Sequence, residues 1–275
     1  VNIKHPIIAL GSGANSTIAY SLNGSKWSGL SKSIFTTGYG AAWNGALWVA
    51  VGDGSYNIAY SYDGLQWSGI NNSDLGIGRC VAWDGTIWVA GGSNGTLVNS
   101  YNGVVWTKIS STTSLLSSCN AIAWNGKIWV ATGTTSGGST DNFVYSTNGT
   151  TWTKGDSYPE GDIVAGNCLA WNGQFWFAGC NVDTDKPIPN YAILSSNDGK
   201  EWFSILSPNI VFQNQCNGLA WNGYMWVAVG VDGPGTAINN TIAWSMDGFN
   251  WTGLGATIFS VSGNSVCWTG DKWVA

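Results

Sequence analysis

The chain has 275 residues, of which 9% are charged and 13% aromatic, and its formal net charge is −5. Abundant aromatic residues and a small net charge exclude a disordered chain, and the lack of a basic run makes nucleic acid and anionic membranes poor partners. No apolar stretch approaches the roughly 18 residues that a membrane-spanning helix needs.

Two tryptophan motifs alternate along the chain after a short apolar run at residues 7–10 that predicts a β-strand. The first, Ser-x-(Asp/Asn)-Gly-x-x-Trp, is called the Ser-Asx-Gly box here; its six copies end at Trp27, Trp67, Trp106, Trp152, Trp202 and Trp251. The second, Trp-x-Gly-x-x-Trp, is called the Trp hairpin; its six copies begin at Trp43, Trp83, Trp124, Trp171, Trp221 and Trp268. Successive boxes lie 39 to 50 residues apart. Such a period predicts repeated units that bury their apolar faces only against their neighbours.

One repeat, residues 78–110, illustrates the predicted unit. Residues 78–83 form a first strand that ends at the Asp84-Gly85 turn, and residues 87–90 form a second. Residues 96–100 and 104–109 form a third and a fourth strand, with Asn102-Gly103 between them. Four short antiparallel strands in about forty residues are the content of one propeller blade.

Repetition of this unit predicts an all-β protein, a single six-bladed β-propeller domain over residues 1–275 with four-stranded antiparallel blades. The expected blades cover residues 38–77, 78–118, 119–165, 166–215, 216–262, and 263–275 together with 1–37. Pairing of the N- and C-terminal strands would close the last blade and leave no exposed edge strand. Seven blades are the alternative if flanking sequence is missing.

The box Ser61-Tyr62-Asp63-Gly64-Leu65-Gln66-Trp67 and its counterparts resemble the Asp-box, or BNR repeat, of sialidases, sortilin-type receptors and photosystem assembly factors. The Trp hairpin followed by a box is similar to uncharacterised repeat proteins of bacteria and large DNA viruses. The resemblance spans essentially the whole chain. It implies a propeller and leaves the activity open, because a fold does not specify a function.

The third position of each box is expected to serve the turn. An Asp or Asn side chain accepts hydrogen bonds from backbone N–H groups two residues on, and the glycine supplies the positive φ. The position holds Asn23, Asp63, Asn102, Asn148, Asp198 and Asp247. Because a charged and a neutral acceptor interchange there, we predict turn chemistry, with no metal and no cofactor.

Small residues precede the first tryptophan of each hairpin at one, three and five positions, and alternation predicts that they share one strand face. Five of the six cysteines lie at these positions: Cys80, Cys119, Cys168, Cys216 and Cys267. We interpret them as small apolar fillers. A disulfide between blades, such as Cys80 with Cys119, is the alternative, and the sequence does not decide between the two.

Loops that differ between repeats are the expected ligand surface, because specificity on a rigid scaffold lies in variable loops. In a four-stranded meander, the second–third loops and the connections between blades lie at the end opposite to both motif turns. The candidate residues there are Asp156, Tyr158, Glu160, Asp162, Asp183, Asp185, Lys186, Tyr191 and Asp232. Nineteen tryptophans suggest sugar stacking, yet eighteen occupy repeat-fixed positions and the nineteenth, Trp244, replaces a repeat tyrosine, which favours a core role.

Enzyme chemistry has little support in the composition. A sialidase would need an arginine cluster, but Arg79 is the only arginine, and a catalytic triad would need a base other than the isolated His5. Paired carboxylates, such as Asp162 with Asp183, leave glycoside hydrolysis as the chemistry that the composition permits.

We therefore predict a non-enzymatic interaction or structural scaffold that binds a protein partner or assembly neighbour through its variable loops. A lectin-like glycan-binding module is the alternative, and a carboxylate-dependent glycoside hydrolase is a less favoured one. No signal peptide is visible in this sequence, and the location stays open, with an extracellular or particle-surface one favoured over the cytoplasm.

Overall fold

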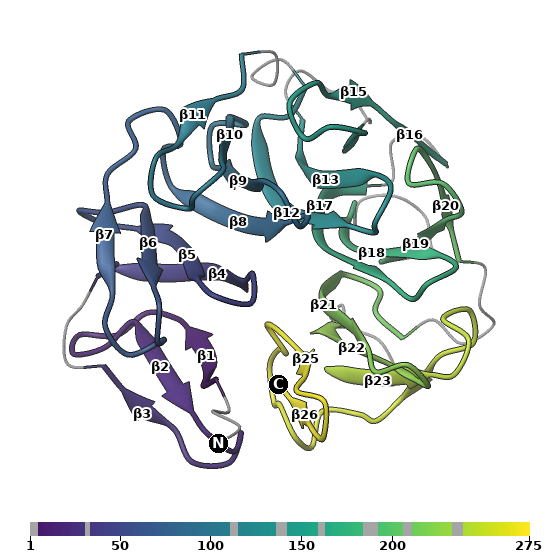
Figure 1. Ribbon diagram of the computed structural model, residues 1–275. Helices are drawn as coiled ribbons and strands as arrows, with labels where there is room; N and C mark the ends of the chain where they lie inside the picture. The colour runs from purple at the N-terminus through teal and green to yellow at the C-terminus, as the bar shows by residue number, and fades with distance from the viewer. Residues whose placement is uncertain are drawn as a thin grey trace. The chain divides into compact units, whose positions relative to one another are not determined.

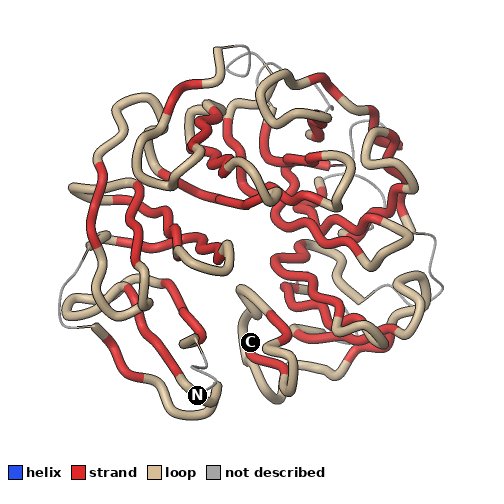
Figure 2. The backbone as a smooth tube through the Cα atoms, in the orientation of Figure 1, coloured by secondary structure: helices blue, strands red, loops and turns tan. Residues whose placement is uncertain are grey.

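The computed structural model describes residues 5–30, 34–110, 115–135, 142–158, 163–183, 192–205, 211–232 and 239–275. Its regular elements in these ranges are β-strands, and no helix occurs among the described residues (Figure 2). In the described ranges the strands form an all-β arrangement of mainly antiparallel sheets, three of which are four-stranded (Figure 1).

The chain divides into two compact units, residues 1–127 with 146–152 and residues 128–145 with 153–275. The first unit begins with a three-stranded sheet of β1 (Ile7–Leu10), β2 (Ile18–Ser21) and β3 (Ser28–Gly29). Two four-stranded sheets follow, β4 (Thr37–Trp43), β5 (Trp48–Asp53), β6 (Ile58–Ser61) and β7 (Ser68–Ile70), then β8 (Gly78–Trp83), β9 (Trp88–Gly92), β10 (Leu97–Ser100) and β11 (Thr107–Lys108). The division between the units falls within the next sheet, β12 (Ser118–Trp124), β13 (Trp129–Thr134), β14 (Phe143–Ser146) and β15 (Thr153–Lys154).

The second unit contains two further four-stranded meanders that one bridge, between Asn181 and Gln215, joins into a single sheet. They consist of β17 (Ile163–Trp171), β18 (Trp176–Val182), β19 (Ile193–Ser196) and β20 (Glu201–Ser204), and of β21 (Gln215–Trp221), β22 (Trp226–Val231), β23 (Ile242–Ser245) and β24 (Thr252–Gly253). An additional strand, β16 (Asp156–Tyr158), pairs parallel to β20. The hairpin of β25 (Cys267–Trp268) and β26 (Trp273–Val274) is the last element.

The apolar cores of each unit lie between neighbouring sheets. In the first unit, Val49, Val51 and Ile58 pack with Trp88 and Val98 of the following sheet. Because each sheet is covered by its neighbour, the strands β5 and β9 read as nearly continuous apolar runs rather than as alternating ones. This is the packing that the repeat predicts.

Five of the Trp hairpins place their two tryptophans opposite each other. Trp43 pairs with Trp48 across β4 and β5, and their ring centroids are 5.2 Å apart. Between them, Asn44 Oδ1 accepts hydrogen bonds from the backbone N–H groups of Ala46 and Leu47 at 2.9 and 2.7 Å. The same ring contact, at 5.0 to 5.3 Å, occurs at Trp83–Trp88, Trp171–Trp176, Trp221–Trp226 and Trp268–Trp273. Aromatic pairs of this kind add to the stability of the hairpin beyond the area they bury.

A β-bulge corrects the prediction that three small residues of each first strand share a face. In β4, Gly38 pairs with Gly52 and Gly40 pairs with Val51, so that Tyr39 is the extra residue. Neighbouring residues of β5 point to opposite faces, and therefore Gly38 and Gly40 do as well. The prediction holds for the positions one and three before the tryptophan and is wrong for the position five before it. The same shift occurs in β8, β17 and β21.

Candidate functional site

The two ends of the meanders differ in the way that the sequence predicts. At one end, called the turn end, lie the Trp hairpin turns and the Ser-Asx-Gly boxes, which are alike in every described repeat. At the other, called the loop end, lie the second–third loops and the connections between sheets. Since the uniform turns are explained by structure, the loop end is where a site that differs between repeats would lie.

The boxes at the turn end are closed by their own side chains. In the box of β6, Asp63 Oδ1 accepts hydrogen bonds from the backbone N–H groups of Leu65 and Gln66, both at 2.8 Å. Ser61 Oγ accepts one from Gly64 N at 2.8 Å, and Gly64 has φ of 75°. These bonds lower the pKa of Asp63, the Gln66 N–H being the largest cause. The other boxes repeat the pattern with Asn23, Asn102, Asn148, Asp198 and Asp247.

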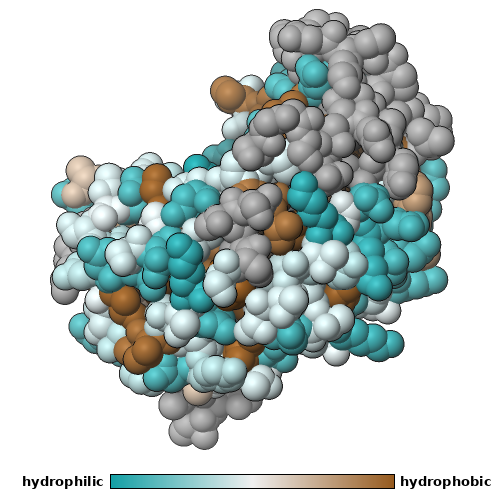
Figure 3. All heavy atoms as spheres, turned by 90° about the horizontal axis from the view of Figure 1, so that it is seen from above, coloured by the Kyte–Doolittle hydropathy of each residue, from teal (hydrophilic) through white to brown (hydrophobic). Residues whose placement is uncertain are grey.

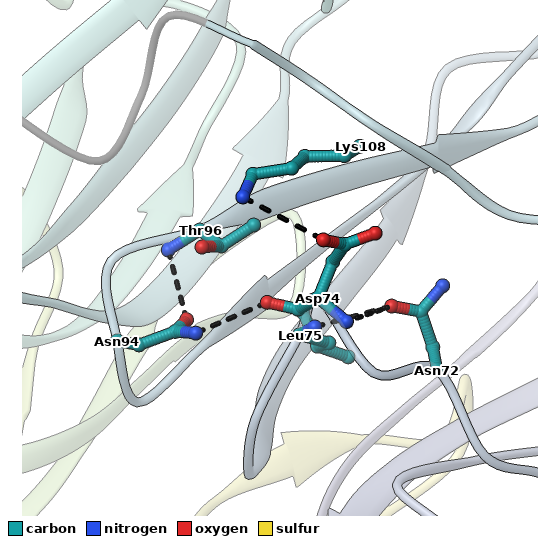
Figure 4. Close-up of polar contacts among 6 residues, drawn as sticks. All are labelled: Asn72, Asp74, Leu75, Asn94, Thr96 and Lys108. Atoms are coloured by element: carbon teal, nitrogen blue, oxygen red, sulfur yellow. Dashed lines mark hydrogen bonds and ion pairs between the residues drawn. The ribbon is translucent and has the colours of Figure 1, made fainter.

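At the loop end of the β8–β11 sheet, residues 71–77 and 93–96 together with Lys108 form a polar cluster, called the loop surface here (Figure 4). Asn94 Nδ2 donates a 3.0 Å hydrogen bond to the carbonyl oxygen of Asp74, and Asn94 Oδ1 accepts one from Thr96 N at 3.1 Å. The Asp74 carboxylate lies 3.5 Å from Lys108 Nζ, and both side chains are 44% exposed. An ion pair this exposed is worth only about 0–1 kcal/mol, so both charges are available to a partner.

The buried side-chain amide of Asn57 holds the loop surface in place through hydrogen bonds to the connection at residues 71–77. Asn57, only 8% exposed, donates from Nδ2 to the carbonyl oxygens of Asn72 and Gly76 at 2.6 and 2.7 Å. Its Oδ1 accepts a 2.9 Å hydrogen bond from Asn72 N. Leu75, in the same connection, is fully buried in the core between sheets. The connection is therefore held in one conformation before any ligand arrives.

In the second unit, Asp232 has the same role, although the sequence placed it among the ligand candidates. It is 7% exposed, and its two carboxylate oxygens accept hydrogen bonds from Gln213 N at 3.0 Å and Asn240 N at 3.1 Å. A nearby amide, Asn240, accepts a bond from Gly255 N at 3.1 Å. Asp232 therefore joins two loops from inside and is not presented to solvent.

The remaining candidates do not form one cluster among the described residues. Asp156 lies in β16 beside Glu201 of β20, and its backbone N–H donates a 2.8 Å bond to Lys200 O within a box. Tyr158 ends the same strand, and Asp183 follows β18. Glu160, Asp162, Asp185, Lys186 and Tyr191 lie outside the described residues. Nowhere in the described ranges do three or more His, Cys, Asp or Glu side chains gather as metal ligands would.

Sequence reasoning missed one pair, the exposed Tyr39 and the partly buried Arg79, which are the extra residues of the bulges in β4 and β8. The guanidinium carbon of Arg79 lies 5.6 Å from the ring centroid of Tyr39, which is 47% exposed. Alternation alone could not reveal the pair, because the bulge changes which residues point outwards. Their occurrence at the same position before the hairpin tryptophan was the available signal.

The surface drawn in Figure 3 is mostly hydrophilic or intermediate in hydropathy, and its hydrophobic residues appear as small separate patches. In the part of the chain that the structure describes, no helix has both the length and the apolar character needed to cross a bilayer.

The sequence matches no protein-family model and no curated protein. Its structure is similar to solved β-propellers. The GH74 enzyme of Niastella koreensis is 16% identical with a TM-score of 0.58, over 96% of this chain and 40% of that one. YCF48 bound to D1 peptide is 15% identical with a TM-score of 0.65, over 98% and 86%. A chain of the nidogen/laminin complex is 12% identical with a TM-score of 0.57, over 82% and 84%.

These likenesses show the β-propeller fold, and this chain spans only 31% to 40% of the length of the GH74 enzymes it matches. They also contradict the prediction that the chain is not an enzyme, because glycoside hydrolases share its fold. The single arginine, Arg79, and the isolated His5 bear only on sialidase and triad chemistry. Glycoside hydrolysis by a pair of carboxylates requires neither an arginine cluster nor a histidine base.

Proposed function

We propose that the chain is a single six-bladed propeller, closed by its terminal strands, that binds a protein partner or assembly neighbour through its loop end. Six copies of each motif support the blade number, and seven blades remain the alternative with flanking sequence. Protein binding is supported in general by the similar structures that were solved with a peptide or with a protein partner.

The observation that carries this proposal is the anchoring of the loop surface by Asn57. A loop that is already ordered loses little conformational entropy when a partner binds, which favours affinity. Exposed polar groups such as Asn94 and the Asp74–Lys108 pair then supply directional contacts at the rim. Asp232 anchors a second pair of loops in the same manner in the other unit.

A site-specific photocrosslinker tests the proposal. The photoreactive amino acid benzoylphenylalanine is placed at Asn94 on the loop end and, as the matched control, at Thr86, which is exposed on the turn end of the same sheet. We expect a discrete protein adduct from position 94 in the expressing cells and none from position 86. An adduct from position 86 alone, or no protein adduct from either, would contradict the proposal.

A glycan-binding module is the alternative ligand class. It predicts a clear binder on a glycan array, and that binding should be weakened by Asn94→Ala but not by Thr86→Ala. The variable loops share no residue pattern between repeats, which is unfavourable to a set of equivalent sugar pockets.

A carboxylate-dependent glycoside hydrolase is the second candidate, and one observation favours it. Asp156 and Glu201 are register partners on the parallel strands β16 and β20, and both are exposed. Paired carboxylates are the usual groups of glycoside hydrolysis. Since one similar structure is a xyloglucanase of Xanthomonas campestris, xyloglucan is the first substrate to assay. Turnover that Asp156→Asn and Glu201→Gln abolish would establish this function, whereas unchanged turnover in both variants would remove the pair from it.

A further inference from the structure

Two pairs of cysteines meet between neighbouring meanders in the same way, one pair in each unit. Cys80 Sγ lies 3.5 Å from Cys119 Sγ, and both residues are buried. Cys216 hydrogen-bonds the Cys168 side chain at the corresponding positions of the second unit. In each pair, one cysteine lies three positions and the other five positions before a hairpin tryptophan. All six cysteines of the chain are free thiols in this structure.

The bulge explains why these two positions face each other. In β21, Cys216 pairs with Gly230 and Gly218 pairs with Val229, so the residue five before the tryptophan points to the face opposite to the one three before it. The residue five before the tryptophan therefore faces the preceding repeat. There it meets the residue that lies three positions before that repeat's own hairpin tryptophan. The repeat thus brings the same two positions together at four junctions between neighbouring meanders, two with cysteines and two with glycines.

A third residue in each junction shows that the space is matched to the pair. A Cβ added at Gly91 would lie 2.5 Å from Cys119 Sγ and 2.8 Å from Cys80 Sγ. At Gly179 it would lie 2.6 Å from Cys168 Sγ and 2.7 Å from Cys216 Sγ. Where two glycines take the place of the cysteines, the third residue is a valine instead, Val51 against Gly40 and Gly78, and Val229 against Gly218 and Gly263.

Space filling alone does not explain the pairing. One cysteine opposite an alanine or serine would occupy a comparable volume, yet at the positions three and five before the tryptophan the cysteines of the chain occur only as these two facing pairs. From this geometry we infer that Cys80–Cys119 and Cys168–Cys216 are two disulfide sites that link neighbouring meanders covalently under oxidising conditions. The inference is independent of what the loop surface binds.

The chemistry is thiol–disulfide exchange with a low-molecular-weight disulfide such as glutathione disulfide. One protein thiol loses its proton and attacks a sulfur of the small disulfide, releasing a thiolate that takes up the proton. The second protein thiol, after losing its proton, displaces the remaining glutathione from the mixed disulfide and forms the Sγ–Sγ bond. Two protein thiols are oxidised, one disulfide is reduced to two thiols, and the sulfurs approach from 3.5 Å to the bonded distance of about 2.05 Å.

Burial of the thiols determines whether thiol–disulfide exchange is faster before or after folding. The hydrogen bond with Cys80 and burial raise the pKa of Cys119, and burial together with Cys168 raises the pKa of Cys216. One thiol of each pair, Cys119 or Cys216, is therefore seldom ionised in the folded protein near neutral pH, so oxidation is expected to be faster during refolding than afterwards.

Peptide mapping after refolding in a glutathione redox buffer tests the inference. Trypsin cuts after Arg79, Lys108 and Lys127, so the first link joins peptides 80–108 and 109–127. Chymotrypsin cuts between Cys168 and Cys180, at Trp171 and Phe175, and therefore identifies the second link. We expect four of the six thiols to disappear, with Cys180 and Cys267 free. Six free thiols, or a major link to Cys180 or Cys267, would overturn the inference.

Cysteine-to-serine variants assign each disulfide link to its two cysteines. Cys119→Ser should remove the first link and keep the second, Cys216→Ser should do the reverse, and Cys180→Ser should keep both. Oxidation of the wild-type protein should raise Tm on the order of 10 °C per link by the loop-entropy relation. No Tm difference between oxidised and reduced protein, with both links present, would contradict their role as cross-links between sheets.

Discussion

The indole nitrogen of Trp67 donates a 3.0 Å hydrogen bond to the carbonyl oxygen of Gly64, three residues earlier in the same Ser-Asx-Gly box. The box thereby closes on itself, with its aromatic ring buried and its polar atom satisfied. The same bond occurs at Trp106, Trp152, Trp202 and Trp251. Trp27 differs, being 38% exposed. The recurring residues of the box thus act on the turn and the adjoining core.

Removal of the box acceptor should destabilise the protein. Asp63→Ala deletes the oxygen that accepts from Leu65 N and Gln66 N, a loss comparable to that of a helix cap, about 1 kcal/mol. Asp63→Asn is the matched control, because an amide oxygen accepts the same bonds in the boxes of Asn102 and Asn148. Urea denaturation gives both free energies of unfolding. Equal values for the two variants would contradict the acceptor role.

Acid should weaken the three aspartate boxes. Burial raises the pKa of Asp247, but hydrogen bonds from the backbone and side chain of Asn250 outweigh it and lower the pKa to about 2. The pKa values of Asp63 and Asp198 are also lowered. A carboxyl with a depressed folded-state pKa stabilises the fold above its unfolded value and loses this as pH falls through the folded one.

We therefore expect the urea midpoint to decrease between about pH 4 and 2 as these groups protonate. The triple variant Asp63→Asn, Asp198→Asn, Asp247→Asn should show a flatter dependence over this range. If the urea midpoint depends on pH equally steeply in the variant and the wild type, the box carboxylates do not cause the pH dependence.

Box glycines should tolerate substitution less than hairpin glycines. Gly103 has φ of 73°, and an added Cβ would lie 2.5 Å from Leu47 Cδ2. Gly85 has φ of 102° but nothing within 4 Å of such an atom. Both alanine variants incur the left-handed backbone cost of about 1–2 kcal/mol, and only Gly103→Ala adds a clash with the core. Thermal denaturation should therefore give a clearly lower Tm for Gly103→Ala than for Gly85→Ala.

Two buried tryptophans of one sheet separate hydrogen bonding from packing. Trp251 Nε1 donates to Gly248 O at 2.7 Å, whereas Trp226 Nε1 has no partner among the described residues. Replacement by phenylalanine leaves a void at both, but only Trp251→Phe leaves the buried Gly248 carbonyl without its donor. We expect Trp251→Phe to cost about 1–2 kcal/mol more in unfolding free energy. A larger loss for Trp226→Phe would contradict this assignment.

The sequence predicted the repeats because their turns depend on local chemistry. Asn44 with Gly45, and Asp63 with Gly64, form bonds within a few residues, so their patterns are visible without a structure. The bulge at Tyr39 was not visible, because it depends on pairing with β5, and it reversed the face of Gly38. Asp232 was assigned to a ligand surface since its partners, Gln213 and Asn240, are set by the tertiary fold.

The central claim is that the recurring indoles lie inside the repeats. Hydroxyl-radical footprinting with mass spectrometry measures the solvent reactivity of each tryptophan separately. Trp88, Trp129, Trp176, Trp202 and Trp226, all at 0% exposure, should be strongly protected relative to Trp27 at 38%. Unfolding in urea should remove this difference. If the five react in the native protein as readily as Trp27, the indoles face solvent and the account is contradicted.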